Sequence, residues 1–128
     1  MRTAQRFFVP SMLVFALAGA ALTASVGCGA PETLDDHPCP PGGTSLTYES
    51  FGKGFMDAYC QSCHAAHATE RYGAPGGYAF DTADDVRRLR ARIFVRAAGA
   101  NVSMPPGPND PSAAERDKLA DWLACGAP

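Results

Sequence analysis

The chain has 128 residues, enough for one domain, and its high content of glycine (13) and proline (11) favours a loop-rich fold. Acidic residues outnumber basic ones by 13 to 11, and the sequence has no basic stripe, which argues against nucleic-acid binding. The five cysteines are many for this length. They indicate metal binding or catalysis in a reducing compartment and disulfides in an oxidising one, so the compartment must be known first.

The first 27 residues are typical of an export signal. Arg2 and Arg6 precede an uncharged apolar run that ends in small residues before Cys28. This cysteine resembles that of a bacterial lipobox, which predicts lipid on Cys28 and anchoring to a membrane on its periplasmic side. A transmembrane anchor and an ordinary signal with an incidental cysteine are the alternatives. Removal of residues 1–27 takes away two of 11 basic residues and no acidic ones, which leaves a formal charge of −4.

Beyond the signal, residues 28–44 are rich in glycine, proline and acids and show no apolar period, which predicts a flexible tether. Residues 45–128 form the predicted domain. Apolar periodicity, N-cap residues and terminal glycines predict three main helices in it, at 45–59, 81–99 and 112–126. The sequence has no alternating strand pattern, so the fold class is all-α with long loops.

The second predicted helix places acidic residues before a run of arginines. This order suits the helix dipole, and a solvated helix face is the simplest interpretation. A docking patch for an acidic partner is the alternative. The residues are Asp81, Asp84, Asp85, Arg87, Arg88, Arg90, Arg92 and Arg96.

The strongest motif is C-x-x-C-H, formed by Cys60, Cys63 and His64, with His67 three positions later. Structural zinc sites usually combine ligands from separated segments, whereas these four groups lie in one short segment. A thiol redox pair would need a βαβ context, which the sequence does not show. The spacing favours covalent haem attachment instead, with both thiols bonded to the porphyrin and His64 bound to iron.

A haem that transfers electrons needs a second axial ligand, commonly Met or His. Met104 is the best candidate, because it lies forty residues after His64 on a rigid, proline-rich loop. His67 is too close to His64 to reach the opposite face of the ring. His37 lies in the tether, and Met56 lies on the helix before the motif. A loop methionine that fills a gap is the alternative interpretation of Met104.

Two further cysteines, Cys39 and Cys125, remain after lipid and haem are assigned. In an oxidising compartment the simplest expectation is a disulfide between them, which would tie the tether to the last helix. Two free thiols are the alternative.

The haem motif, the Met-Pro-Pro-Gly stretch at Met104 and a final helix with Leu119 and Trp122 resemble class I c-type cytochromes over residues 46–126. The resemblance implies a small cytochrome c fold, in which three helices and long loops wrap one haem. It also implies that the helix before the motif crosses the last helix closely.

Particular residues follow from that resemblance. Gly52 or Gly54 would permit the close approach of the two helices, and the carbonyl of Pro75 would hold the proximal histidine. The residues that hold the haem propionates are expected among Arg71, Tyr72, Tyr78, Asn101 and Trp122.

The predicted function is one-electron transfer by a monomeric, membrane-tethered haem c protein with transient redox partners. It is not enzymatic, because His64 and Met104 leave iron no open position. A haem-based sensor of NO, CO or O2 and a zinc-binding lipoprotein are the alternatives. A peroxidase would usually need a second haem, and the chain has one C-x-x-C-H motif.

Overall fold

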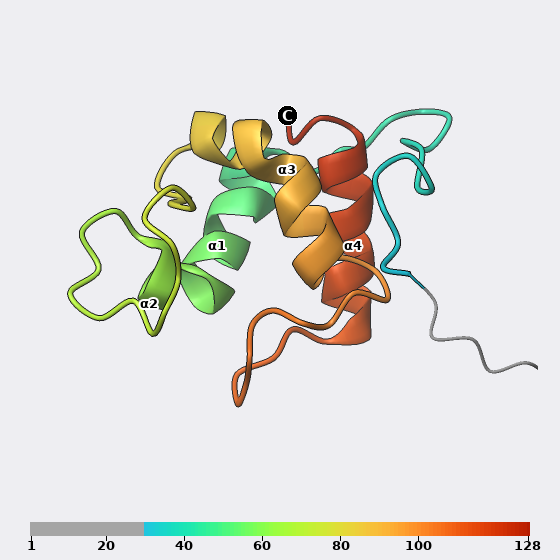
Figure 1. Cartoon of the computed structure of the whole chain (residues 1–128). Helices are drawn as coiled ribbons and strands as arrows, with labels where there is room; N and C mark the ends of the chain where they lie inside the picture. Colours follow the sequence, from blue (N-terminus) through green and yellow to red (C-terminus); the bar gives the residue numbers. More distant parts are fainter. Residues whose placement is uncertain (1–29) are drawn as a thin grey trace, which may run out of the picture.

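The computed structural model describes residues 30–128, and their regular structure is entirely helical (Figure 1). The predicted all-α class is confirmed for these residues. The predicted export signal and Cys28 lie outside them, and no helix between residues 30 and 128 is long and apolar enough to cross a membrane. The elements are a π-helical turn η1 (Tyr48–Gly52) and the helices α1 (Lys53–Tyr59), α2 (Gln61–His64), α3 (Ala83–Ala97) and α4 (Ala113–Ala124).

The helix predicted over residues 45–59 begins three residues later than expected and consists of two parts. Thr47 is its N-cap and forms a capping box with Ser50, because each side chain bonds to the backbone N–H of the other. The turn η1 then continues directly into α1. The short helix α2 follows and contains Cys63 and His64.

The two later helices begin where the sequence predicts. The Thr82 side chain accepts a hydrogen bond from the N–H of Asp85 at the start of α3. Ser112 and Glu115 form the predicted capping box at the start of α4. Both helices turn an apolar face to the core. The buried residues of α3 are Val86, Ile93, Phe94 and Ala97, and those of α4 include Leu119, Ala120, Trp122 and Leu123.

The segment formed by η1 and α1 approaches α4 closely at Gly52. A Cβ atom on Gly52 would overlap the indole ring of Trp122, whereas a Cβ on Gly54 would meet no atom within 4 Å. Of the two glycines considered from the sequence, Gly52 therefore permits the contact. Phe51 lies edge-on to the same indole, with ring centroids 5.8 Å apart. This contact positions the segment that leads into Cys60.

The segment before the first helix, residues 30–44, is non-helical but lies against α3 and α4. Cys39 and Cys125 form the predicted disulfide, with Cα atoms 4.7 Å apart. His37 reaches the α4 residue Asp121, with Nε2 and Oδ1 3.0 Å apart. The prediction of a flexible tether is therefore corrected for residues 30–39, because a covalent bond and partly buried polar contacts dock this segment on the domain up to the disulfide.

Candidate functional site

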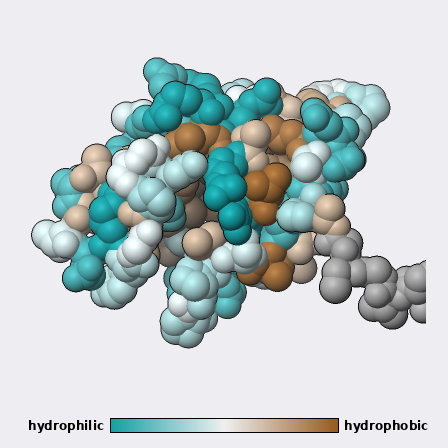
Figure 2. Space-filling model, in the orientation of Figure 1, coloured by the Kyte–Doolittle hydropathy of each residue, from teal (hydrophilic) through white to brown (hydrophobic). Residues whose placement is uncertain are grey.

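A cavity of about 390 Å³ is lined by residues of α1, α2, α3 and the loops that follow α2 and α3. Figure 2 shows hydrophobic residues grouped in the middle of one face, with hydrophilic residues around them. The volume falls in the range of about 300–1,000 Å³ that is usual for small-molecule and cofactor sites. All five residues expected to hold the cofactor line this cavity: Cys60, Cys63, His64, Pro75 and Met104.

His64 is fixed in one tautomer. Its Nδ1 lies 2.7 Å from the carbonyl oxygen of Tyr78. Because a carbonyl only accepts hydrogen bonds, Nδ1 carries a proton, and in the neutral imidazole the lone pair is then on Nε2. The imidazole also stacks on the ring of Phe80, with centroids 4.7 Å apart and 21° between the planes. A histidine oriented in this way can bind a metal through Nε2.

The expectation that the Pro75 carbonyl holds His64 is wrong. That carbonyl accepts hydrogen bonds from the guanidinium group of Arg71 at 3.0 Å and from the N–H of Tyr78 at 3.1 Å. Residues 75–78 thus form a turn, and it is the carbonyl at the end of the turn that reaches the imidazole. Pro75 still lines the cavity.

Arg71 closes the loop between α2 and α3. Its guanidinium group donates to the carbonyl oxygens of Ala65, Ala74 and Pro75 at 2.6, 3.1 and 3.0 Å. One side chain thereby joins the start of the loop, at Ala65, to its middle, at Ala74 and Pro75. The loop is closed beside the part of the cavity that contains His64.

Met104 lies in the Met104 loop, residues 98–112, which joins α3 to α4. Its N–H donates to the Arg96 carbonyl at 2.8 Å, and its carbonyl accepts from Arg116 at 2.8 Å. The residue lines the cavity and remains 40% exposed. Met56, in contrast, is fully buried in the core. Of these two methionines, Met104 is therefore the one placed to reach a group in the cavity.

The two cysteines of the motif are free thiols. Burial, with a smaller effect from Cys63, raises the pKa of the Cys60 thiol to about 12. Thiol redox pairs depend on a lowered pKa, so this environment does not suit a redox pair. His67, which the zinc interpretation needs, is 90% exposed and lies 3.9 Å from Asp81. Within residues 30–128, no three His, Cys, Asp or Glu side chains gather in a way that could hold a metal ion.

Arginines supply the formal charges around the cavity, whose described lining contains no acidic residue. Arg71, Arg92 and Arg96 line it, and the guanidinium carbon of Arg92 lies 5.7 Å from the ring centroid of Tyr78. Arg92 and Arg96 were not among the residues predicted to hold carboxylates, although their spacing of four places them on one helix face. Other α3 arginines, Arg87, Arg88 and Arg90, bond to acids of the first turn or to carbonyls near the end of α4.

Two of the residues predicted to hold the haem propionates, Asn101 and Trp122, do not line the cavity. The side-chain amide of Asn101 donates to the carbonyls of Glu32 and Phe94, and the indole N–H of Trp122 points to the Pro128 carbonyl. Both polar groups are used inside the fold. The remaining candidates, Arg71, Tyr72 and Tyr78, do line the cavity.

Comparison with the models of known families gives no match, and neither the curated proteins nor the solved structures contain a match to this chain. Its function is therefore inferred from the chemistry of the site itself.

Proposed function

We propose that the cavity binds one haem c, attached through Cys60 and Cys63, with His64 and Met104 as the axial ligands of iron. The observation that carries the proposal is the state of His64. Its Nδ1–H donates to the Tyr78 carbonyl, which leaves Nε2 available in a cavity that two free thiols also line. On this proposal the chain is a class I c-type cytochrome.

The charge of the cavity supports an occupant with carboxylates. Haem carries two propionates, and cations near them would offset the cost of removing those charges from water. Arg71 already donates to three backbone carbonyls. Arg92 and Arg96 are therefore the better candidates to hold the propionates, with Tyr72 and Tyr78 as further hydrogen-bond donors from the loop.

When bound, such a group supplies a one-electron Fe(III)/Fe(II) couple. The chain would occupy both axial positions with His64 and Met104 and leave none for a substrate, which supports electron transfer and argues against catalysis at iron. The Tyr78 carbonyl would increase the basicity of His64, and a thioether ligand favours a higher reduction potential than a second histidine. A small, transient contact with redox proteins fits this role.

We propose further that the chain is exported and anchored to a membrane by lipid on Cys28. The Cys39–Cys125 disulfide supports an oxidising compartment. Because the segment up to Cys39 docks on the domain, the lipid would hold the domain close to the membrane surface.

An absorption spectrum tests the proposal. The protein would be expressed in a host that attaches haem c, and spectra would be recorded before and after dithionite and in alkaline pyridine. We expect a c-type haemochrome whose pigment stays on the chain after acid–acetone extraction. A colourless protein that contains zinc would contradict the proposal and favour the zinc-binding lipoprotein.

The partial exposure of Met104 keeps the sensor as a second candidate. A far-red thioether-to-iron band that disappears in Met104→Ala, with slow CO binding by the reduced protein, would support the carrier. Rapid CO binding by the unmodified protein would show that Met104 leaves iron easily, and would favour the sensor.

A further inference from the structure

Arg116 is a buried cation that does not line the cavity. It lies on α4, is 4% exposed, and its Nη1 donates to the carbonyls of Ala97, Asn101 and Met104 at 2.9, 3.2 and 2.8 Å. This nitrogen has two hydrogens, so three acceptors must share them. The carboxylate of Asp110 lies 3.5 Å from Nη2. A charge is costly to bury unless it is hydrogen-bonded, so these carbonyls are needed to accommodate it.

The three carbonyls belong to one stretch of chain, from Ala97 at its start through Asn101 to Met104 at its end. Ala97 is the last residue of α3, where backbone carbonyls have no partner within the helix. Met104 is the residue proposed to bind iron. Arg116 therefore ties the end of α3 and the proposed ligand to a single point on α4. An apolar side chain at this position would leave all three carbonyls without this donor.

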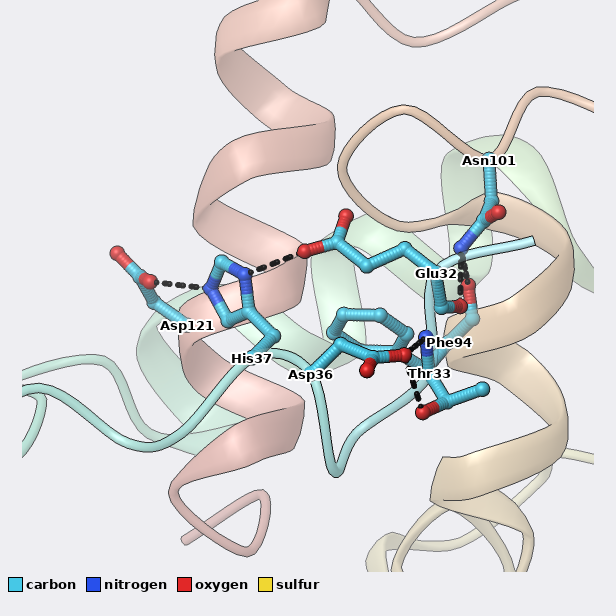
Figure 3. Close-up of polar contacts among 7 residues, drawn as sticks. All are labelled: Glu32, Thr33, Asp36, His37, Phe94, Asn101 and Asp121. Carbon is cyan, nitrogen blue, oxygen red and sulfur yellow. Dashed lines mark hydrogen bonds and ion pairs between the residues drawn. The ribbon is translucent and has the colours of Figure 1, made fainter. Parts of the chain in front are cut away.

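Asn101 extends the same network outward (Figure 3). Its side-chain amide donates to the Phe94 carbonyl on α3 at 3.1 Å and to the Glu32 carbonyl of the N-terminal segment at 2.8 Å. Its own carbonyl accepts from Arg116. The stretch from Ala97 to Met104 is thus bonded to three separate parts of the fold.

We propose that Arg116 is a positioning residue that keeps Met104 at the cavity and so keeps the second axial position closed. The role at iron rests on the proposed function, whereas the effect on the loop rests on the hydrogen bonds alone. Without Arg116, Met104 would leave the cavity more often and a small ligand could take its place.

Hydrogen exchange of the Met104 amide tests the effect on the loop without reference to haem. This N–H donates to the Arg96 carbonyl at 2.8 Å. Arg116→Gln is expected to speed its exchange by about ten-fold or more, the factor that corresponds to one lost hydrogen bond from a charged donor. Arg116→Lys, which keeps the charge, should restore part of the protection.

Arg90→Gln is the matched control. It removes another arginine-to-carbonyl hydrogen bond between α3 and α4, from Arg90 Nη1 to the Leu123 carbonyl at 3.1 Å, away from Met104. In the haem-loaded protein, Arg116→Gln should weaken the far-red thioether band and speed CO binding by about ten-fold, because the open state is more populated. Arg90→Gln should leave both unchanged, even if it lowers the unfolding temperature equally.

Asp110→Asn covers the case in which Arg116→Gln does not fold. Asp110 is half-exposed beside Arg116. Removing its charge should therefore also speed the exchange of the Met104 amide, but by a smaller factor than Arg116→Gln. Unchanged exchange of this amide in the Arg116 variants, or equal effects in Arg116→Gln and Arg90→Gln, would overturn the positioning role. Altered exchange in a chain that binds no haem would support that role and overturn the proposed function.

Discussion

The two loops beside the cavity are held in different ways. The loop after α2 uses partners that are near in sequence: His64 bonds to the carbonyl of Tyr78, 14 residues on, and Arg71 bonds to carbonyls at most six residues away. The Met104 loop adds distant partners to near ones such as Arg96 and Phe94. Asn109 donates to a carbonyl 51 residues away and Asn101 to one 69 residues away. The His64 side is therefore largely a local structure, whereas the Met104 side requires the complete fold.

The largest expected effect comes from removing the local motif. The double variant Cys60→Ala, Cys63→Ala should lose covalent haem completely, because both thioether bonds need these sulfurs. Haem that remains on the chain after acid–acetone extraction is the measurement. Ser62→Ala, in the same turn, is the control and should retain the pigment. Retention in the double variant would contradict the proposed attachment.

Breaking the disulfide should weaken the side that depends on distant contacts. Cys39 and Cys125 are 86 positions apart, and the chain-entropy model gives a loss of about 4–5 kcal/mol for a loop of this length. Denaturant unfolding of Cys39→Ser, Cys125→Ser measures the free energy. Wild-type protein reduced with dithiothreitol should lose a similar free energy of unfolding to that of the double variant. Exchange of the Met104 amide should rise more than that of the Tyr78 amide, and the reverse order would contradict the comparison.

The segment formed by η1 and α1 packs on α4 through Gly52 and Trp122. This contact joins the helices that lead to His64 and to the end of the Met104 loop. Gly52→Ala should destabilise the protein by about 1–3 kcal/mol, because the new methyl group overlaps Trp122. Gly54→Ala is the matched control. Its Cβ meets no atom within 4 Å and it favours the helix, so it should stabilise by about 0.5–1 kcal/mol. Equal effects of both variants on the free energy of unfolding would exclude this close approach.

The smallest effect is expected at His37, whose ring lies between Asp121 and Glu32 (Figure 3). The hydrogen bond to Asp121 raises the pKa of His37 above 6.5, with a further contribution from Glu32 and against the effect of burial. Protonated His37 thus stabilises the fold. The contribution is complete below the unfolded pKa of 6.5 and disappears as the pH rises through the higher folded value.

Unfolding of wild type and His37→Gln across this pH range measures that contribution. The difference should reach about 0.5–1 kcal/mol at low pH, since the pair is partly exposed, and vanish at high pH. His67→Gln is the control, because its side chain is 90% exposed. A difference that increases with pH would have the wrong sign for this interaction.

Local patterns in the sequence were sufficient for the helical class, the caps of α3 and α4 and the residues of the C-x-x-C-H turn. They were also sufficient for the disulfide, because Cys39 and Cys125 were the two cysteines left after the predicted lipid and haem were assigned. Each of these conclusions depends on residues a few positions apart or on a covalent rule. The haem, the lipid and the iron ligands stay predictions.

The tertiary structure decided which of two glycines faces Trp122, that Tyr78 rather than Pro75 holds His64, and that the segment before Cys39 is docked. It also brought the guanidinium group of Arg116 to three carbonyls between Ala97 and Met104, whereas the sequence presents this residue only as one more charge on an amphipathic helix. The physical reason is common to all four. Burial and hydrogen-bond partners depend on which backbone groups the closed fold brings together, and sequence periodicity does not contain that information.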